Sequence, residues 1–416
     1  SSRIENSYAT GAVQAQGSYA GGLSGNNHTN SVIKNSYATG AVSGIERVGG
    51  LLGNNYSSTV ENSYATGQVT RTSGNAMTFG GLVGWYGGTI NNSYYDKTST
   101  GQANAVGDGT GTVNATDITV ANRYSRNGYS NLGTWSLLAG TTNVYVAKDA
   151  SNQNQWVMIE GQTRPFLWSE YSTNINNLHQ LQLMAVDLTK NYTVHHNIDA
   201  TATNGVNTSD MWSTAGFSPI GNLSNEFKGK FDGLNHTISN LTINRQSQDY
   251  VGLFGATNNS TIQNIGLIQA NVRGSWRVGA LIGEANYTNT SNAFSTGQVN
   301  GFHVVGGLVG ANLNQSSILS SYSNAQVTAT DSFAGGLSGA NENSSRIENS
   351  YATGAVQAQG SNSNAGGLSG NNFVNSVIKN SYATGAVSGI DAVGGLLGNN
   401  DSSTVENSYA TGQVTR

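Results

Sequence analysis

The sequence predicts an all-β protein built as a parallel β-solenoid, with about 28 residues per coil and irregular loop insertions. A glycine-leucine motif, Gly-Gly-Leu-x-Gly in most copies, recurs every 27 to 31 residues within two blocks of the chain. The hexapeptide NSYATG occurs six times and keeps step with this motif. The composition agrees with strands broken by turns, since 55 residues are glycine and only 2 are proline.

The glycine-leucine motif defines the length of one coil. A single repeat cannot bury its own apolar side chains, but it can if successive coils stack at the strand spacing of about 4.8 Å. The same residue of each repeat then lies directly above itself, and we expect the leucines to form an aliphatic ladder inside the solenoid. These leucines are Leu23, Leu51, Leu82, Leu253, Leu281, Leu308, Leu337, Leu368 and Leu396.

The segment around each hexapeptide has the period of a strand. In SSTVENSYATGQVT (residues 57–70), Val60, Asn62 and Tyr64 occupy alternate positions, whereas a helix would place apolar residues three and four apart. Each repeat thus offers about three short strands, separated by glycine and Asn-Asn turns. The alternation with Val60 favours tyrosines that point inward and fill the core. The alternative is an exposed tyrosine column that stacks on sugar rings.

Stacking of the hexapeptides predicts two further ladders. The tyrosines should form an aromatic ladder, and the asparagines should form an amide ladder in which side chain bonds to side chain at a turn. In the first block these residues are Tyr8, Tyr37 and Tyr64, and Asn6, Asn35 and Asn62.

A second, longer period of about 345 residues is superimposed on the short one. Residues 1–71 return as residues 344–416 with scattered substitutions and a two-residue insertion, which indicates tandem duplication of a large unit. The chain opens in the middle of the pattern, so we expect it to be a piece of a longer protein with several copies. We expect β-helix coils over residues 1–99, an irregular closing segment over 100–173, lead-in coils over 174–250, and further coils over 251–416.

The part without glycine-leucine motifs is less regular. Residues 96–124 are polar and glycine-rich, and we interpret them as loop and irregular coil. Residues 125–170, which contain Trp135, Trp156 and Trp168, resemble a closing segment of one solenoid module. The stretch NNLHQLQLMA (residues 176–185) is the one short helix we expect.

Composition excludes several classes of function. Charged residues make up 10% of the chain and the formal net charge is −4, which argues against a nucleic-acid partner. The absence of cysteine excludes disulfides and thiolate metal sites. No apolar run approaches the ~18 residues of a membrane span, so we expect no membrane insertion.

The combined motifs resemble a known family. The pattern GGLxG followed by NSYATG is similar to the GLUG repeat of large bacterial surface proteins, and NNSYYDKTSTGQ and GQTRPFLW resemble the usual ending of such repeats. The family includes filamentous-haemagglutinin-like adhesins of two-partner secretion, among them biofilm-matrix adhesins of the CdrA type. It also includes surface metallopeptidases that carry the repeats outside their catalytic domain. The resemblance implies an extended right-handed β-helix, export to the cell surface, and a role in adhesion or aggregation.

Three sets of residues could form a catalytic or metal site, but each can also be explained as an ordinary turn or strand. Asp232 and His236 could form an acid/base pair, but DG also makes a turn. In HHNID, His195, His196 and Asp199 could bind a metal, yet adjacent strand residues point to opposite faces. Residues 107–117 suggest a calcium loop but lack its ligand spacing. We therefore assign no catalytic, metal or cofactor residue and expect no enzyme activity; a β-helix polysaccharide-degrading enzyme is a remote alternative.

The function we expect is that of a stalk. A rigid rod segment of a secreted adhesin, at the bacterial surface or in the extracellular matrix, would support cell adhesion and aggregation. Alternatively, the repeats themselves bind matrix exopolysaccharide, the surface of a host or neighbouring cell, or identical rods through many weak contacts. The Asn-x-Ser/Thr sequons, such as Asn27, Asn114 and Asn222, follow from the composition and leave glycosylation open.

Overall fold

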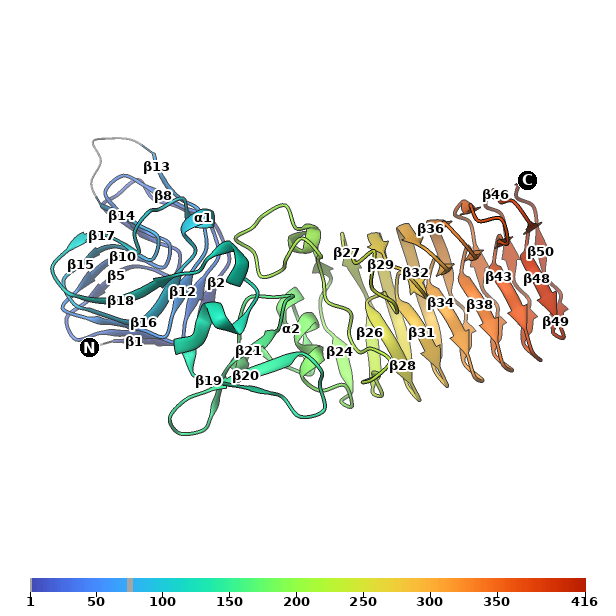
Figure 1. Cartoon of the computed structure of the whole chain (residues 1–416), viewed down its shortest axis with the longest axis horizontal. Helices are drawn as coiled ribbons and strands as arrows, with labels where there is room; N and C mark the ends of the chain where they lie inside the picture. The colour runs from blue at the N-terminus through green and yellow to red at the C-terminus, as the bar shows by residue number, and fades with distance from the viewer. Residues whose placement is uncertain (1, 73–77) are drawn as a thin grey trace. The chain divides into compact units, whose positions relative to one another are not determined.

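The computed structural model describes residues 2–72 and 78–416, which form stacked parallel coils (Figure 1). Within these residues, strands account for 51% and helices for 7%, and there are about 15 coils of roughly 28 residues. The predicted β-solenoid is therefore confirmed. The chain divides into two compact units. The N-terminal unit comprises residues up to Ala139, Asn143–Glu170 and Gly205–Ser213, and the C-terminal unit comprises Gly140–Thr142, Tyr171–Asn204 and Thr214–Arg416.

A complete coil of the N-terminal unit contains five short strands, where the sequence predicted about three. The strands are β1 (Arg3–Glu5), β2 (Tyr8–Ala9), β3 (Val13–Gln14), β4 (Tyr19–Gly21), β5 (Ser24–His28), β6 (Val32–Lys34), β7 (Tyr37–Ala38), β8 (Val42–Gly44), β9 (Arg47–Gly49), β10 (Leu52–Tyr56), β11 (Thr59–Glu61), β12 (Tyr64–Ala65), β13 (Val69–Arg71), β14 (Thr78–Gly80) and β15 (Val83–Tyr86). Equivalent strands pair in parallel, so that Ile4, Ile33, Val60 and Ile90 stack in one column.

The stretch from residue 96 to 124, expected to be irregular, largely continues the solenoid. After β16 (Thr89–Tyr95) come α1 (Lys97–Thr100), β17 (Val106–Gly109), β18 (Thr112–Asp117) and the 3-10 turn η1 (Val120–Asn122). Strand β17 pairs in parallel with β15, and β18 pairs with β16. The loop prediction is therefore wrong here, because backbone pairing with the preceding coil compensates for the polar side chains of these strands.

A small antiparallel sheet follows the last coil of the N-terminal unit. It consists of β19 (Thr134–Leu137), β20 (Val144–Lys148), β21 (Asn154–Ile159) and β22 (Phe166–Leu167), flanked by the 3-10 helices η2 (Arg126–Leu132) and η3 (Trp168–Glu170). We call residues 119–139 and 143–170 the closing segment. Its regular sheet differs from the irregular conformation that the sequence predicted.

The C-terminal unit stacks its coils in three sheets, drawn from green to red in Figure 1. The largest contains β23 (Asn174–Ile175), β24 (Tyr192–Val194), β25 (Ile198–Asp199), β26 (Lys230–Ser239), β27 (Thr242–Asn244), β29 (Thr261–Arg273), β32 (Asn289–Gly301), β35 (Ser317–Leu319), β36 (Tyr322–Ala329), β39 (Arg346–Glu348), β40 (Tyr351–Ala352), β41 (Val356–Ala358), β44 (Val377–Lys379), β45 (Tyr382–Ala383), β46 (Val387–Ser388), β49 (Thr404–Glu406), β50 (Tyr409–Ala410) and β51 (Val414–Thr415). The second contains β28 (Phe254–Asn258), β31 (Ile282–Asn286), β34 (Val309–Leu313), β38 (Ser338–Glu342), β43 (Ser369–Phe373) and β48 (Leu397–Asp401). The third contains β30 (Val278–Gly279), β33 (Val304–Gly306), β37 (Phe333–Gly335), β42 (Asn364–Gly366) and β47 (Ala392–Gly394).

The expected short helix is present at the start of the C-terminal unit. Helix α2 (Leu178–Gln182) begins at Asn177, whose side chain accepts a hydrogen bond from the backbone N–H of Gln180. The 3-10 helices η4 (Leu183–Val186) and η5 (Thr201–Asn204) follow it. The helical prediction for residues 176–185 is confirmed.

The leucine ladder is confirmed as the inner core. Leu281, Leu308, Leu337 and Leu368 are fully buried, and the backbone N–H of Leu308 donates to the carbonyl of Leu337 at 3.0 Å. Leu396, in the last coil, is partly exposed. Each leucine of an inner coil is therefore covered by the coils on either side, as a stacked rod requires.

The tyrosines of the hexapeptides lie outside the coil, so the prediction that they fill its core is wrong. Ala38 and Ala65, which follow Tyr37 and Tyr64, belong to the inner cluster with Leu51 and Val60, and neighbouring strand residues point to opposite faces. The reason is the corner before each tyrosine. Asn62 has a φ of 48°, in the left-handed region, which reorients the chain and resets the alternation read from Val60.

The amide ladder is present in the C-terminal unit. The side-chain amide of Asn380 donates to Asn349 at 3.3 Å, and that of Asn407 donates to Asn380 at 3.4 Å. In the N-terminal unit, Asn35 donates instead to Gln155 of the closing segment at 2.9 Å.

A second amide ladder, which sequence reasoning missed, runs through the second residue of the Ala-Asn or Asn-Asn pair that follows each glycine-leucine motif; we read the Asn-Asn pairs as turns. Asn312 donates to Asn341 and Asn341 donates to Asn372, both at 2.8 Å. Asn372 in turn donates to Asn400 at 2.7 Å. All but Asn400 are fully buried, so these amides form a polar seam inside the coil.

Candidate functional site

An aromatic column on the outer face of the N-terminal unit is the centre of a large cluster of packed and hydrogen-bonded side chains. The ring centroids of Tyr8 and Tyr37 lie 5.3 Å apart, and those of Tyr37 and Tyr64 lie 4.9 Å apart with an interplanar angle of 2°. Tyr94 pairs with Tyr64 in the next coil. The stack follows from the parallel register, because each hexapeptide places its tyrosine directly over the one before.

The closing segment covers this column. Trp156, which is fully buried, lies 6.2 Å from the ring of Tyr37 and 5.7 Å from that of Tyr64. Tyr129 packs edge-on against Tyr64 with the ring centroids 5.6 Å apart. Tyr37 and Tyr64, although outside the coil, are consequently inaccessible to solvent.

Hydrogen bonds fix the cover in register with the column. The hydroxyl of Tyr37 donates to the Glu170 carboxylate at 2.9 Å, and that of Tyr64 donates to the carbonyl of Pro165 at 2.7 Å. The backbone N–H of Asn131 donates to the hydroxyl of Tyr94 at 2.6 Å. Each covered tyrosine therefore has its own partner in the closing segment.

Burial changes the acidity of these phenols. Loss of solvent raises the pKa of Tyr37 well above its usual value, and the neighbouring Glu170 carboxylate raises it further. Burial likewise raises the pKa of Tyr64. Tyr129, in contact with Arg164, has its pKa raised by burial to about 12. The phenols are held neutral, as packing and hydrogen-bonding groups.

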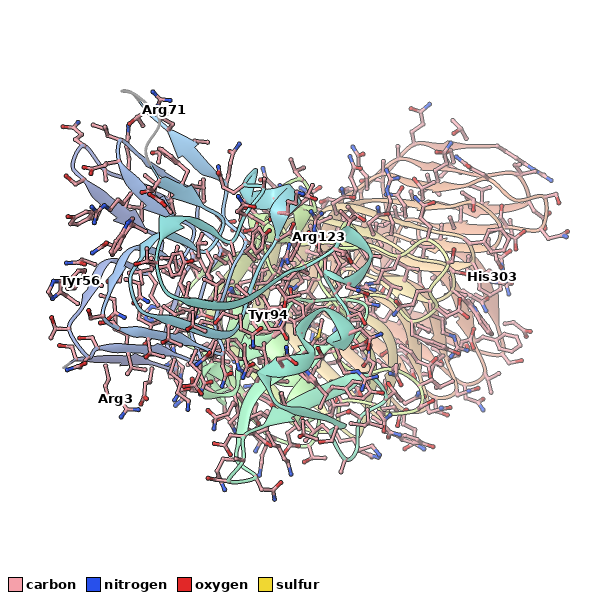
Figure 2. All side chains as sticks on the ribbon, turned by 60° about the vertical axis from the view of Figure 1, so that its left-hand side comes forward. Arg3, Tyr56, Arg71, Tyr94, Arg123 and His303 are labelled. Carbon is pink, nitrogen blue, oxygen red and sulfur yellow. The ribbon has the colours of Figure 1, made fainter. Side chains whose placement is uncertain are left out.

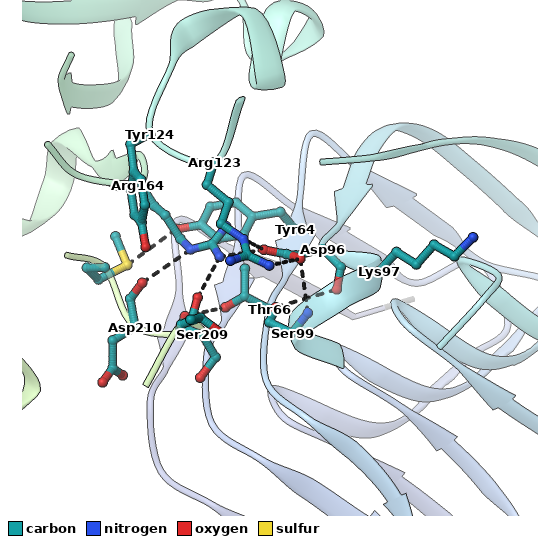
Figure 3. Close-up of polar contacts among 12 residues, drawn as sticks. Tyr64, Thr66, Asp96, Lys97, Ser99, Arg123, Tyr124, Arg164, Ser209 and Asp210 are labelled. Atoms are coloured by element: carbon teal, nitrogen blue, oxygen red, sulfur yellow. Dashed lines mark hydrogen bonds and ion pairs between the residues drawn. The ribbon is translucent and has the colours of Figure 1, made fainter. Parts of the chain in front are cut away.

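A buried ion cluster ties the closing segment to the last coil (Figure 3). Asp96, at the N-terminus of α1, accepts hydrogen bonds from Arg123 at 2.6 and 3.0 Å and from Arg164 at 2.6 Å. It also accepts one from the backbone N–H of Ser99 at 3.0 Å. Asp96 and Arg164 are fully buried. Arg123, labelled in Figure 2, belongs to the closing segment and is also buried.

Arg164 joins three separate stretches of the N-terminal unit. Besides Asp96, its guanidinium donates to the Tyr129 hydroxyl at 3.1 Å, to the carbonyl of Thr208 at 2.8 Å and to that of Asp210 at 3.2 Å. Arg is suited to this role because its planar group presents several donors in a fixed geometry. Thr66 adds a further link, since its hydroxyl donates to the carbonyl of Ser209 at 2.6 Å.

The ion cluster is arranged for structure. Burial alone would raise the pKa of Asp96, but hydrogen bonds from Arg123 and Arg164 and their charge outweigh it, so the pKa is lowered. A carboxylate saturated by two guanidinium groups and one backbone N–H is a poor proton donor or acceptor. Sequence reasoning assigned the ion cluster no role. Asp96 and Arg164 nevertheless lie in the two stretches that resemble the ending of the family's repeats, NNSYYDKTSTGQ and GQTRPFLW.

The sequence-predicted acid/base pair is not assembled. Asp232 accepts hydrogen bonds from Gln263 at 2.6 Å and Asn264 at 2.9 Å, whereas His236 contacts Asn197 at 3.2 Å. A bulge between Asp232 and His236 interrupts their strand pairing and separates the two environments. Asp232 therefore has a structural role: its carboxylate links β26 to the side chains of the next coil.

The two other candidate sets have ordinary strand and turn surroundings. His195 and His196 are exposed, and Asp199 accepts hydrogen bonds from Thr201 and Asn240. Residues 107–117 form β17, β18 and the turn between them. Among the described residues, no three or more histidine, aspartate or glutamate side chains are grouped to hold a metal ion.

The C-terminal unit carries an exposed aromatic patch beside a groove. Trp276 is 39% exposed and Phe302 is 53% exposed. Both rings lie close to that of His303, at centroid distances of 5.9 Å for Trp276 and 6.1 Å for Phe302. A groove of about 390 Å³ adjoins Phe302, lined also by Gln246, Arg273 and Asn300. Amide, guanidinium and aromatic groups here share one surface.

Comparisons with known proteins agree with a repetitive surface protein. The GLUG motif matches residues 16–43, 44–70, 334–357 and 391–415. Over 143 residues, 33% of this chain, the sequence is 38% identical to halomucin of Haloquadratum walsbyi. That match spans only 2% of the length of halomucin. The repeats, the solenoid and this match fit a repeat region of a large surface protein.

A weaker likeness links the chain to a solved structure. A crystal structure from Bacteroides ovatus, described as a candidate immunoglobulin A1 protease, aligns with a TM-score of 0.43 and 24% identity. The alignment covers 57% of this chain and 74% of that one, and at this level it supports no conclusion about activity. No helix within residues 2–72 and 78–416 is long and apolar enough to cross a membrane.

Proposed function

We propose that this chain is a stalk segment of a large extracellular adhesin, a rigid rod that supports adhesion and aggregation of cells. The observation that carries the proposal is the unbroken stacking of equivalent residues from coil to coil. In the C-terminal unit, Phe254, Ile282, Val309, Ser338, Ser369 and Leu397 follow one another in parallel register. Such a stack resists bending because each coil is hydrogen-bonded along its length to both neighbours.

The finer assignment rests on the resemblance of the repeats. We propose that the parent protein is a filamentous-haemagglutinin-like adhesin of a bacterial surface or biofilm matrix, exported by two-partner secretion. Tandem copies of the ~345-residue unit would hold a distal binding region away from the cell, each copy adding about 50–60 Å at the strand spacing.

The rod is tested by changing its length. Because residues 344–416 repeat residues 1–71, copies of residues 72–416 can be joined head to tail in register. We would place one or three copies between a cell anchor and a domain of known ligand, and measure particle length by electron microscopy and capture of ligand-coated beads. We expect equal length steps per copy and capture that requires the terminal domain. Steps that scatter like a flexible chain would refute the rod.

A second candidate function is direct binding of polysaccharide, favoured by the exposed aromatic patch at Trp276 and Phe302. Aromatic faces stack on sugar rings, and the neighbouring amide and guanidinium groups can bond to hydroxyls. If the patch binds glycan, the chain should retain a matrix polysaccharide on an array and lose it in a Trp276→Ala, Phe302→Ala variant. Binding by neither protein would leave the stalk as the sole function.

A further inference from the structure

The two copies of the duplicated segment have the same aromatic column in different surroundings. Tyr382 and Tyr409 correspond to Tyr37 and Tyr64, at a spacing of 345 residues. Their rings stack in the same way, with centroids 5.3 Å apart, after Tyr322, Tyr351 and Tyr382 at 4.8 Å intervals. Yet Tyr37 and Tyr64 are fully buried, whereas Tyr382 is partly exposed and Tyr409 is 56% exposed.

Those groups within residues 1–71 that receive the closing segment are all retained in the second copy. In the N-terminal unit they are two phenols and the amide of Asn35, which donates to Gln155; the hydroxyl of Thr66, which donates to Ser209, holds the separate stretch of residues 205–213. The corresponding residues are Tyr382, Tyr409, Asn380 and Thr411. Their strands have the same parallel register in both units.

The differences between the copies lie on other faces. The six substitutions are Tyr19 to Asn364, His28 to Phe373, Thr29 to Val374, Glu46 to Asp391, Arg47 to Ala392 and Tyr56 to Asp401. They fall in or next to β4, β5, β9 and β10, in sheets other than the one that contains β7 and β12. Tyr56, for example, projects from the edge of the N-terminal unit (Figure 2). The residues of the strands that carry the column are therefore identical while the remaining surface varies.

We propose that the open column at Tyr382 and Tyr409 is the docking face for a second closing segment, one with the sequence of residues 119–139 and 143–170. This occupant would make the contacts already present in the N-terminal unit. An indole would pack on the two phenol rings, a carboxylate would accept a hydrogen bond from one phenol, and a carbonyl would accept one from the other. The inference concerns how units join and does not depend on what the rod adheres to.

The occupant should come from the next unit of a tandem array. Residues 344–416 end in Val-Thr-Arg, as residues 1–71 do, and in the first copy the chain continues with Thr72. A further copy that starts at Thr72 would therefore continue the coil in register. In a separate molecule, the closing segment is already docked on its own column, and its Trp156 and Glu170 are buried there. Docking between molecules would therefore require that segment first to detach.

Chemical modification of tyrosine tests the proposal. We would compare the 416-residue chain with one in which residues 72–343 follow Arg416, and measure nitration by tetranitromethane. Trypsin releases residues 380–416 as one peptide, since no lysine or arginine interrupts it until Arg416, and fragmentation separates Tyr382 from Tyr409. We expect both to react about tenfold more slowly, or slower still, in the extended chain, since covered phenols react only when the segment opens.

Internal controls are present in the same digest. The peptide 347–379 reports Tyr351, the counterpart of Tyr8, which is 37% exposed, and its nitration should change far less between the two chains than that of Tyr382 and Tyr409. The peptide 35–47 reports Tyr37, which should stay protected in both. Trp156→Ala in the added copy alone should restore nitration, which separates docking from the shielding of Tyr409 by an extra coil.

Two outcomes would overturn the proposal. In the first, Tyr382 and Tyr409 react equally in the two chains while Tyr37 stays protected. In the second, the unextended chain becomes protected as its concentration rises, which would mean that a separate molecule provides the cover.

Discussion

At the residue scale, single polar side chains define the geometry of each coil. Asn6, Asn35, Asn62, Asn349 and Asn380 all adopt φ between 45° and 51°. Asparagine tolerates this left-handed conformation better than other residues with a side chain, so it can turn the coil and then extend the amide ladder. The hexapeptide is thus a corner followed by a strand in which Tyr points out and Ala points in.

The ion cluster makes a prediction at the same scale. Asp96→Asn should destabilise the N-terminal unit by about 3–5 kcal/mol, because it leaves two buried guanidinium groups without their counter-charge. Denaturant unfolding measures the loss, with Asp108→Asn, at an exposed acidic residue of β17, as the matched control. Equal stability of the two variants would contradict the assigned role of Asp96.

The same carboxylate predicts a pH dependence. The pKa of Asp96 is lower in the folded chain than in the unfolded one, so its contribution is fully present above the ordinary value of about 3.9 and is lost as pH falls below it. The wild-type unit should therefore lose stability on acidification more steeply than the Asp96→Asn variant. Unfolding curves at several acidic pH values give the comparison.

At the element scale, the closing segment converts an exterior surface into an interior one. Outside the coil, a tyrosine column would face water. Under Trp156, Tyr129 and Glu170, the rings of Tyr37 and Tyr64 are buried and their hydroxyls are hydrogen-bonded. The closing segment can do this because its antiparallel sheet supplies Trp156, and residues beside the sheet supply a polar partner for the tyrosine of each successive coil. This element thus ties several coils together across their edges.

Removal of the indole should expose the column. Trp156→Ala is expected to destabilise the N-terminal unit by about 3–5 kcal/mol through loss of buried contacts. Burial raises the pKa of Tyr37 and Tyr64, so the stability linked to them is complete below the ordinary value of about 10 and declines as pH rises above it.

An absorbance titration of tyrosinate tests this expectation. In the Trp156→Ala variant, the late-titrating tyrosines should move toward the ordinary value, whereas Trp276→Ala, at an exposed position, should leave them unchanged. An unchanged titration in the first variant would mean that other groups of the closing segment suffice for burial.

At the scale of the whole molecule, position in the stack decides how much a residue contributes. Leu308 is fully buried between two coils, whereas Leu396, at the same position of the last coil, is partly exposed. In a solenoid, stability is a sum of coil and nearest-neighbour terms, so inner coils have two interfaces and outer coils have one.

This difference gives a paired prediction. Leu308→Ala should destabilise the C-terminal unit by about 2–5 kcal/mol, and Leu396→Ala should cost distinctly less. Thermal unfolding of the two variants measures both effects under one condition. Equal losses would indicate that the last coil is as tightly held as the middle ones.

Much of the architecture could be predicted because it is periodic. The spacing of Leu281, Leu308 and Leu337 requires that equivalent residues stack, and the structure stacks them. The prediction that Tyr64 points into the core was wrong, because it assumed that side chains alternate without a break. The left-handed conformation of Asn62 interrupts that alternation. Asp96, Arg123 and Arg164 lie 27 and 68 positions apart, and none of them belongs to a repeated motif, so no repeat indicated that they meet.

The sequence by itself therefore determined the coil length, the parallel stacking and the leucine ladder, because a repeated residue can satisfy its neighbours only by lying over its own copy. Only the tertiary structure decided which face of the coil each tyrosine occupies and which column is covered. Those outcomes depend on the backbone conformation of one corner residue and on a closing segment that is distant in sequence. Identical hexapeptides, at Tyr64 and Tyr409, consequently occur in one chain as a buried column and as an open one.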